Sequence, residues 1–317
     1  MIRAETTSYA AHPVLRGLAS LAAAMVLFVL ASPVSAQESF KTPEEGFGAL
    51  VNAARAQDPQ GILEVLGPDG AGIVSSGDPV ADADTLTRFL TAYDEKHEVS
   101  VEKDVTATLT IGAADFPFPI PLTLRDGRWR FDTLAGSREI LYRRIGRNEL
   151  DTIQTCLAYV DAQEEYADKD RTGAGAGVYA QRIVSRERKK DGLYWPASEG
   201  GDPSPLGALF AEATSAGYRV TGGQAPYHGY LYRILTKQGP DAQGGAVDYV
   251  VNGKMIGGFA LVAYPAQYGN SGVKTFLVNH DGVVFEKDLG PRTGEIARTM
   301  SEFNPDHSWQ KVEATAP

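Results

Sequence analysis

The segment with the strongest chemical signal is rich in aromatic residues and carries a histidine. Residues 226–232 read Pro-Tyr-His-Gly-Tyr-Leu-Tyr, which places His228 between Tyr227 and Tyr230. Aromatic faces around a titratable ring could bind a planar or sugar ligand. The alternative is a packed sheet face with a hydrogen-bonded core histidine. On the first interpretation, the predicted ligand-binding residues are Tyr227, His228, Tyr230, Trp195 and Glu164.

Glu164 enters this set because acidic residues extend one face of a long helix predicted before the aromatic segment. The apolar positions of that face end at Val160, and Glu164 and Asp168 follow on the same side. Either the end of the helix leaves the core and is solvated, or its carboxylates form a cation-binding face. Separately, Glu164, Asp168 and His228 could meet in one cleft at the domain junction as a hydrolase site of unrecognised type.

No metal or cofactor site is expected. Residues 168–173 have the spacing of the first half of a calcium loop, but Tyr179 stands where that loop needs a bidentate glutamate. The histidines after residue 36 follow no zinc-binding pattern; they are His97, His228, His280 and His307. Catalytic residues are therefore left unassigned, and a non-enzymatic role is favoured.

Residues 1–36 have the order of a secretory signal peptide. Arg3 and Arg16 supply positive charge, residues 18–30 are apolar and uncharged, and Val34-Ser35-Ala36 offers small residues for cleavage. The apolar run has 13 residues, whereas a helix needs about 20 to span a bilayer. We therefore expect cleavage, a periplasmic or secreted mature chain, and no stable membrane insertion afterwards.

The expected mature chain is acidic. Removal of residues 1–36 takes away two arginines and one glutamate, which leaves 28 basic and 39 acidic residues. A chain of this charge without a basic block is not expected to bind nucleic acid. Its single cysteine, Cys156, excludes an intramolecular disulfide, so the folded state must depend on its hydrophobic core.

The helices of a first domain are predicted within residues 37–135. Thr42, Pro43 and Glu45 have the spacing of a capping box at a helix start. Asp58-Pro59 begins a second, short helix, and a third carries apolar residues from Leu86 to Tyr93.

A sheet follows in the same domain. Alternation from Val99 to Ile111 predicts strand structure, and Asp126-Gly127 predicts a tight hairpin. Three prolines in residues 116–121 remove every second amide donor, which places this segment at a sheet edge. Helices followed by an antiparallel sheet make an α+β domain, and their order resembles the cone-shaped domains similar to nuclear transport factor 2.

Residues 136–303 are predicted to form a second α+β domain, with a polar tail at 304–317. A long helix is expected from about Gly136 to Ala167, with a break or kink at Gly146 near the domain boundary. Asn252-Gly253 and Asp281-Gly282 predict hairpins in an antiparallel sheet. The expected strands are Tyr227 to Leu235, Asp248 to Val251, Phe259 to Tyr264, Lys274 to Val278 and Val283 to Glu286.

Several blocks of the sequence resemble a bacterial exported family known as domain of unknown function 2950. The resemblance covers the chain after residue 36 and implies an exported bacterial protein, but it implies no activity. Its blocks are residues 67–70, 74–79, 116–121, 143–149, 191–196, 226–232, 251–259 and 278–289.

The C-terminal half has a fainter likeness to the head domains of pilin-like and pseudopilin-like secretion proteins. The likeness rests on a long helix, Gly217-Tyr218, and the strand segments at 230–235, 258–265 and 272–284. The apolar N-terminal helix of a pilin is missing, so the resemblance implies a reused head fold and not filament assembly.

Three functions are consistent with these features. The first is a non-catalytic binding or accessory module of the cell envelope, whose expected partner is an envelope protein or surface component. The second is the hydrolase described above. The third is a small-ligand carrier with an apolar pocket behind Trp129, Phe118 and Tyr93 of the first domain.

Overall fold

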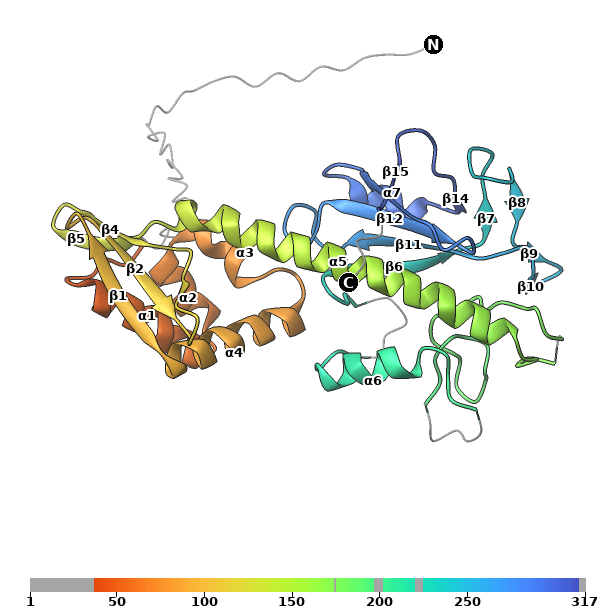
Figure 1. The fold of residues 1–317 in the computed structure, drawn as a ribbon, viewed down its shortest axis with the longest axis horizontal. Helices are drawn as coiled ribbons and strands as arrows, with labels where there is room; N and C mark the ends of the chain where they lie inside the picture. The colour runs from red at the N-terminus through yellow and green to blue at the C-terminus, as the bar shows by residue number, and fades with distance from the viewer. Residues whose placement is uncertain (1–36, 174, 197–201, 220–224, 314–317) are drawn as a thin grey trace, which may run out of the picture. The chain divides into compact units, whose positions relative to one another are not determined.

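The structure is a computed structural model that describes residues 37–173, 175–196, 202–219 and 225–313. The signal peptide expected in residues 1–36 lies outside the described part. Figure 1 labels the helices and strands. The helices are α1 (Pro43–Arg55), α2 (Pro59–Leu66), the 3-10 turn η1 (Pro68–Gly70), α3 (Ala71–Val74), α4 (Pro79–Glu95), α5 (Thr133–Ala167), α6 (Gly207–Ser215) and α7 (Thr293–Thr299).

The predicted helix start at Thr42 is confirmed. The Thr42 hydroxyl accepts a hydrogen bond from the backbone N–H of Glu45 at 3.2 Å. The Glu45 carboxylate reaches back to the N–H of Lys41 at 2.9 Å, one residue earlier than in the standard capping box. Side chains of Thr42 and Glu45 therefore satisfy two backbone N–H groups at the start of α1. The buried face of this helix includes Phe47 and Leu50.

The first sheet is antiparallel and has the order β1-β2-β4-β5, with β3 paired to β2 alone. The one-sided pairing of β3 confirms the edge position predicted from the prolines. Asp126 and Gly127 have positive φ values and join β4 to β5 through the predicted two-residue turn. The strands are β1 (His97–Glu102), β2 (Thr106–Ile111), β3 (Phe116–Pro117), β4 (Leu122–Arg125) and β5 (Arg128–Phe131).

The second large sheet is also antiparallel, in the order β15-β13-β12-β11-β6. Its central strand β12 pairs Val278 with Leu261 of β11 and with Val284 of β13. The main strands are β6 (Tyr230–Leu235), β11 (Ala260–Pro265), β12 (Lys274–Asn279), β13 (Val284–Asp288) and β15 (Gln310–Lys311). Two small sheets complete the half: β9 (Val250–Val251) pairs with β10 (Lys254–Met255), and β14 (Glu302–Phe303), β7 (Lys237–Gln238) and β8 (Val247–Asp248) form a three-stranded sheet.

Two expectations about this half need correction. Residues 304–317 were expected to form a polar tail, but β15 pairs Lys311 with Phe285 of β13 and so belongs to the sheet. The helix α5 was expected to break or kink at Gly146, but it continues through this residue as one helical segment. A single glycine costs a helix only about 1 kcal/mol, which the packing of the rest of α5 can offset.

Two clusters of buried side chains form the core, and α5 takes part in both. The first cluster joins Phe47 of α1 to Leu109 and Leu122 of the first sheet, and Ile140 of α5 packs against it. The second cluster joins Tyr159 of α5 to Phe259 and the second sheet. The division into two domains at residue 135 stays a prediction.

The mixed composition of helices and antiparallel sheets confirms the α+β class. The more detailed likenesses to nuclear transport factor 2 and to pilin heads stay predictions. Within the described residues, every helix is too short or too polar to span a membrane.

Two glycines of α5 provide a test of how closely the helix is packed. A methyl group on Gly136 would overlap the carbonyl oxygen of Pro119 and lie 2.7 Å from Ile120, whereas one on Gly146 would meet no atom within 4 Å. We expect Gly136→Ala to lower the free energy of unfolding by about 2 kcal/mol. Gly146→Ala should raise it by about 0.5–1 kcal/mol, because alanine favours helix. Urea denaturation measures both, and equal effects would contradict the packing described.

Candidate functional site

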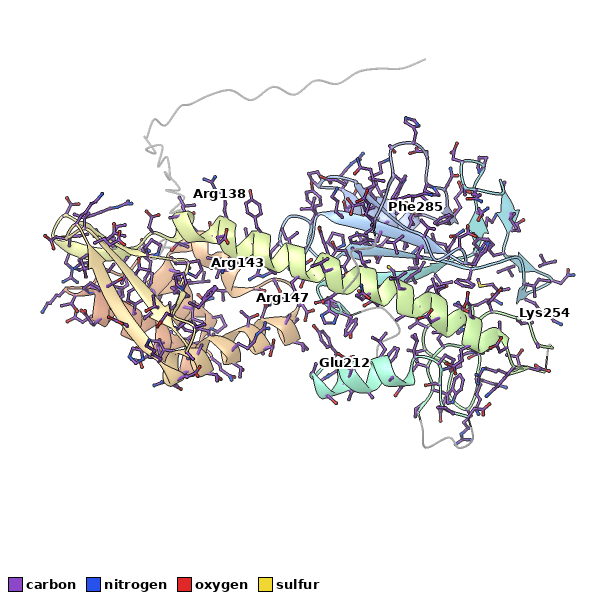
Figure 2. All side chains as sticks on the ribbon, viewed as in Figure 1. Arg138, Arg143, Arg147, Glu212, Lys254 and Phe285 are labelled. Carbon is purple, nitrogen blue, oxygen red and sulfur yellow. The ribbon has the colours of Figure 1, made fainter. Side chains whose placement is uncertain are left out.

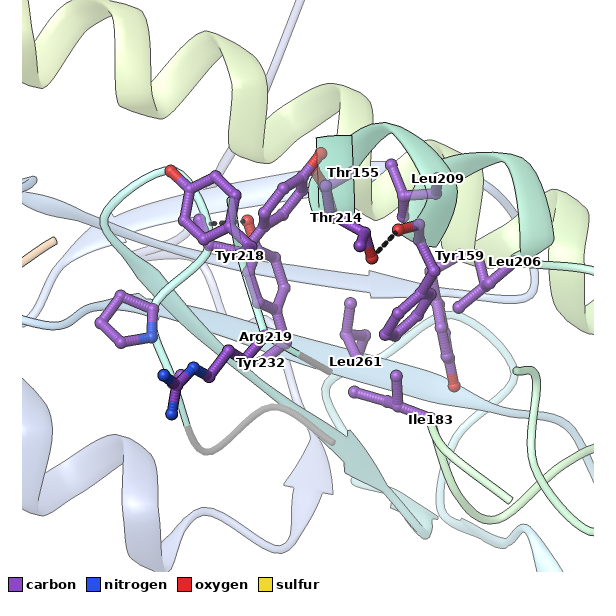
Figure 3. A pocket seen from close by; sticks show the side chains of 15 residues that line it. Thr155, Tyr159, Ile183, Leu206, Leu209, Thr214, Tyr218, Arg219, Tyr232 and Leu261 are labelled. Carbon is purple, nitrogen blue, oxygen red and sulfur yellow. Dashed lines mark hydrogen bonds between the residues drawn. The ribbon is translucent and has the colours of Figure 1, made fainter. Parts of the chain in front are cut away.

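A cavity of about 90 Å³ lies among α5, α6 and the strands β6 and β11. Figure 3 shows the side chains around it. Tyrosines contribute much of the wall, namely Tyr159, Tyr218, Tyr227 and Tyr232. Aliphatic and aromatic side chains contribute most of the remainder, including Ile183, Leu206, Leu209, Phe210 and Leu261.

The helix α6 forms one side of the cavity through its apolar residues. Phe210 stacks on Tyr194 with ring centroids 4.2 Å apart, which holds the helix against the loop that precedes it. Gly217 follows α6 with a φ of +94°, a conformation that few residues other than glycine adopt. The chain therefore turns sharply after α6 and brings Tyr218 to the cavity.

The tyrosine hydroxyls in the deeper wall are hydrogen-bonded inside the protein. Tyr159 donates to the carbonyl oxygen of Ala260 at 3.2 Å, and Tyr232 donates to that of Tyr227 at 3.3 Å. Burial raises the pKa of Tyr159 and Tyr232 well above the usual value, and it raises the pKa of Tyr227 to about 12. These side chains are therefore neutral at physiological pH.

His228 occupies a turn and not the middle of a strand, which corrects the predicted strand start at Tyr227. His228 and Gly229 both have positive φ values, and Tyr227 and Tyr230 exchange backbone hydrogen bonds of 2.9 and 3.1 Å across them. The imidazole is about one third exposed, and its Nδ1 lies 3.4 Å from the Oδ2 of Asp151. The turn thus presents His228 at the edge of the cavity, beside Tyr227.

The five predicted ligand-binding residues do not form one site. Tyr227 lines the cavity and His228 adjoins it, but Tyr230 is fully buried and donates to the carbonyl oxygen of Lys274 at 2.9 Å. Trp195 is 2% exposed, and its ring nitrogen donates to the carbonyl oxygen of Asp202. Glu164 is exposed on α5.

The proposed hydrolase grouping is also not brought together. His228 contacts Asp151, and Glu164 follows Asp151 by 13 residues in the same helix. At 1.5 Å per residue, Glu164 lies about 20 Å farther along α5, and Asp168 lies beyond it. Burial raises the pKa of the Cys156 thiol to about 12, so this thiol is not an active nucleophile at neutral pH.

The residues named for a carrier pocket in the first half pack against their neighbours. Phe118 contacts Phe47 and Phe89 with centroid distances of 6.4 and 5.3 Å, and Trp129 is 7% exposed. Tyr93 stacks on His97 at 3.9 Å. These rings are part of the first cluster or its surface.

In the described part of the chain, no group of three or more His, Cys, Asp or Glu side chains is arranged to hold an ion. In the segment with the calcium-loop spacing, the Arg171 side chain is 3% exposed and lies 3.7 Å from carboxylate oxygens of Glu165 and Asp202. The positive charge beside Glu165 and Asp202 is therefore the Arg171 guanidinium.

A buried carboxylate that the sequence did not reveal connects the cavity to the N-terminal helices. Asp78 is 1% exposed. Its Oδ1 accepts from the N–H groups of Val80 and Ala81 as the cap of α4. Its Oδ2 accepts from the Tyr218 hydroxyl and the Gly229 N–H, both at 2.9 Å.

Two further polar residues of α5 contact the same region. Arg144 donates to the side-chain oxygen of Asn270 at 2.8 Å and to the carbonyl oxygen of Ile73 at 2.8 Å, and its burial lowers its pKa. The Glu149 carboxylate accepts from the N–H groups of Val273 and Lys274, each at 2.9 Å. Three of the segments with the family resemblance, 74–79, 143–149 and 226–232, therefore meet: Asp78 accepts from the N–H of Gly229, and the Tyr230 hydroxyl lies 3.5 Å from the Glu149 carboxylate.

Comparison with known proteins gives one finding. A protein-family model described as "Protein of unknown function (DUF2950)" matches residues 37–312, which confirms the predicted family resemblance. No curated protein and no solved structure matches the chain. The likeness to pilin heads accordingly gains no support from these comparisons.

Asp78 can be tested against a matched aspartate. Asp58 also caps a helix before a proline, but it is exposed, and its side chain accepts a hydrogen bond from the N–H of Gln60 within the same helix start. Asp78→Asn should lower the free energy of unfolding by about 2 kcal/mol, because the new amide group faces the N–H of Gly229 or of the cap. Asp58→Asn should change it by less than about 0.5 kcal/mol, since both residues cap well. Chemical denaturation compares the two variants, and equal losses would show that Asp78 acts only as a cap.

Proposed function

The chain belongs to the DUF2950 family of proteins of unknown function, and we propose that it is a non-catalytic binding module of the cell envelope. The observation that carries this proposal is the cavity among α5, α6 and the second sheet, with its neutral tyrosine and apolar lining. Apolar concave sites with a few fixed polar groups are the usual form of binding sites in proteins.

The size of the cavity favours a small occupant. An engineered apolar cavity of roughly 150 Å³ takes up benzene, and this cavity has about 90 Å³. Its space suits one aromatic or aliphatic group better than a whole cofactor. Protein interfaces often depend on one such anchor side chain in a desolvated pocket. We therefore propose that the occupant is an apolar side chain of a partner protein or an equivalent group of a surface component.

Export is part of the same proposal. It is supported by the charge and hydropathy order of residues 1–36, which predicts a periplasmic or secreted protein. The acidic balance of the chain makes nucleic acid an unfavourable partner. The mature protein would meet its partner outside the cytoplasm.

Filling the cavity tests the proposal. Ala213 of α6 lines the cavity, whereas Ala208 of the same helix is exposed and is not part of its lining. The probe is N-acetylphenylalaninamide, observed by saturation-transfer NMR, with N-acetylglycinamide as the polar reference. Ala213→Leu should weaken binding of the phenyl probe roughly tenfold or more, because the added side chain occupies its space.

Ala208→Leu is the matched control, because it makes the same chemical change on the same helix. It should leave probe binding unchanged. The proposal fails if the unmodified protein binds the glycine and phenylalanine probes equally, or if both leucine variants bind like the unmodified protein.

A hydrolase is a second candidate, favoured by the contact between His228 and Asp151. A carboxylate beside Nδ1 can orient an imidazole as a general base. In this case His228→Gln should abolish hydrolysis of p-nitrophenyl acetate above the background rate. His307→Gln, at an exposed histidine, should not. Equal rates in both variants and the unmodified protein would remove the hydrolase candidate.

A further inference from the structure

We infer that a second cavity, separate from the apolar one, binds an oxyanion on a polar, saccharide-sized ligand. This cavity has about 550 Å³ and lies between the loop 178–191 and the hairpin of β9 and β10. Its charged lining consists of Arg182, Arg186 and Lys254 with one carboxylate, Asp191. Lys254 is labelled at the tip of the hairpin in Figure 2.

Hydrogen bonds between the loop and the hairpin fix the walls. The N–H of Tyr179 donates to the carbonyl oxygen of Met255 at 2.8 Å, and the Gln181 side chain donates to that of Gly253 at 2.8 Å. The ring of Tyr179 packs against Phe259 of the second core cluster at 4.8 Å. The cavity is therefore built on core-supported elements, which reduces the ordering that a ligand must impose.

The Asp191 carboxylate organises the two arginines. It accepts from the N–H of Arg186 at 2.9 Å and from its Nε at 2.6 Å, and its Oδ2 lies 4.0 Å from the Nε of Arg182. Burial acts to raise the pKa of Asp191, but these Arg186 hydrogen bonds and the charges of Arg186 and Arg182 lower the pKa more. Asp191 therefore stays ionised; it fixes the Arg186 guanidinium by a hydrogen bond and lies near the guanidinium of Arg182.

The charge of the lining is opposite to that of the whole chain. Among the described residues that line this cavity, three are cationic and one is anionic, whereas the chain has a formal net charge of −10. A guanidinium group has five N–H donors in a planar fork that suits carboxylate and phosphate oxygens. In the Arg186–Asp191 pair, the Arg186 side chain donates through Nε. The lining thus favours an anionic ligand.

The volume and the other lining groups indicate what carries the anion. A volume of about 550 Å³ exceeds the need of a single carboxylate or phosphate and lies within the range of small-molecule sites. Tyr166, Tyr179 and Gln181 add aromatic faces and polar groups, which suit a hydroxylated ligand. The ligand inferred is therefore a sugar chain that bears carboxylates, and free phosphate, which has the same oxyanion chemistry without the sugar, serves as the comparison.

Isothermal titration calorimetry of the full chain with trigalacturonate, maltotriose and inorganic phosphate tests the inference. Trigalacturonate should bind and neutral maltotriose should not. Arg182→Gln and Lys254→Gln should each weaken trigalacturonate binding roughly tenfold, because each removes a charge-assisted contact. Raising the salt concentration should weaken binding further by screening the partly exposed cations.

Arg188→Gln is the matched control. Arg188 lies in the same loop and its side chain is 88% exposed, but it does not line the cavity. It should change the affinity less than twofold. Circular dichroism melting confirms that each variant is folded, and Ala213→Leu should leave this binding intact because it alters only the apolar cavity.

The phosphate arm distinguishes the sources of the oxyanion. If phosphate binds with the same dependence on Arg182, the site recognises a single anionic group. If only trigalacturonate binds, the site recognises a charged sugar chain. The inference is overturned if neither anion binds, if maltotriose binds as tightly as trigalacturonate, or if Arg188→Gln weakens binding as much as Arg182→Gln.

Discussion

The structure depends on one helix that is longer than a single hydrophobic core can cover. The 35 residues of α5 extend over about 52 Å. Ile140 packs on the first core cluster and Tyr159 belongs to the second. Between them the helix carries polar residues that are partly or fully buried, such as Arg144 and Asn148. Buried polar groups need partners, so the chain segments around the middle of α5 must supply them.

This requirement explains why loops near the cavity have defined positions. Arg144 and Asn148 donate to Asn270 and to the carbonyl oxygen of Ser271, which fixes the loop before β12. Asp78 also accepts hydrogen bonds from the N–H of Gly229 and from the hydroxyl of Tyr218, which lies three residues after the end of α6. The apolar cavity is therefore framed by segments whose positions are set by polar contacts outside it. Removing those contacts would move its wall without changing any residue that lines it.

The sequence allowed prediction of the features that depend on neighbouring residues. The cap at Thr42, the hairpin at Asp126-Gly127 and the edge strand after Asp115 follow from local backbone chemistry. The site did not follow in this way, because Asp78 meets groups 140 and 151 residues away. In the sequence, Asp78-Pro79 predicts only a helix start. The contacts of the second carboxylate oxygen, Oδ2, cannot be predicted from this pattern. The aromatic residues Tyr227, Tyr230 and Tyr232 around His228 favour a strand, so the sequence pattern does not reveal the turn at His228 and Gly229.

The two cavities differ in the physical terms that decide between binding and chemistry. In the apolar cavity, the pKa values of Tyr159, Tyr218, Tyr227 and Tyr232 are all raised, with burial as the largest cause. Acid–base catalysis requires groups whose pKa values are pushed apart, so that one donates a proton and another accepts it. Tyrosines whose pKa values are all raised give a neutral surface instead.

The second cavity, lined by Arg182, Arg186, Lys254 and Asp191, is charged. Its Asp191 is held ionised beside the two permanent cations Arg182 and Arg186. The described residues thus line one apolar cavity and one charged cavity.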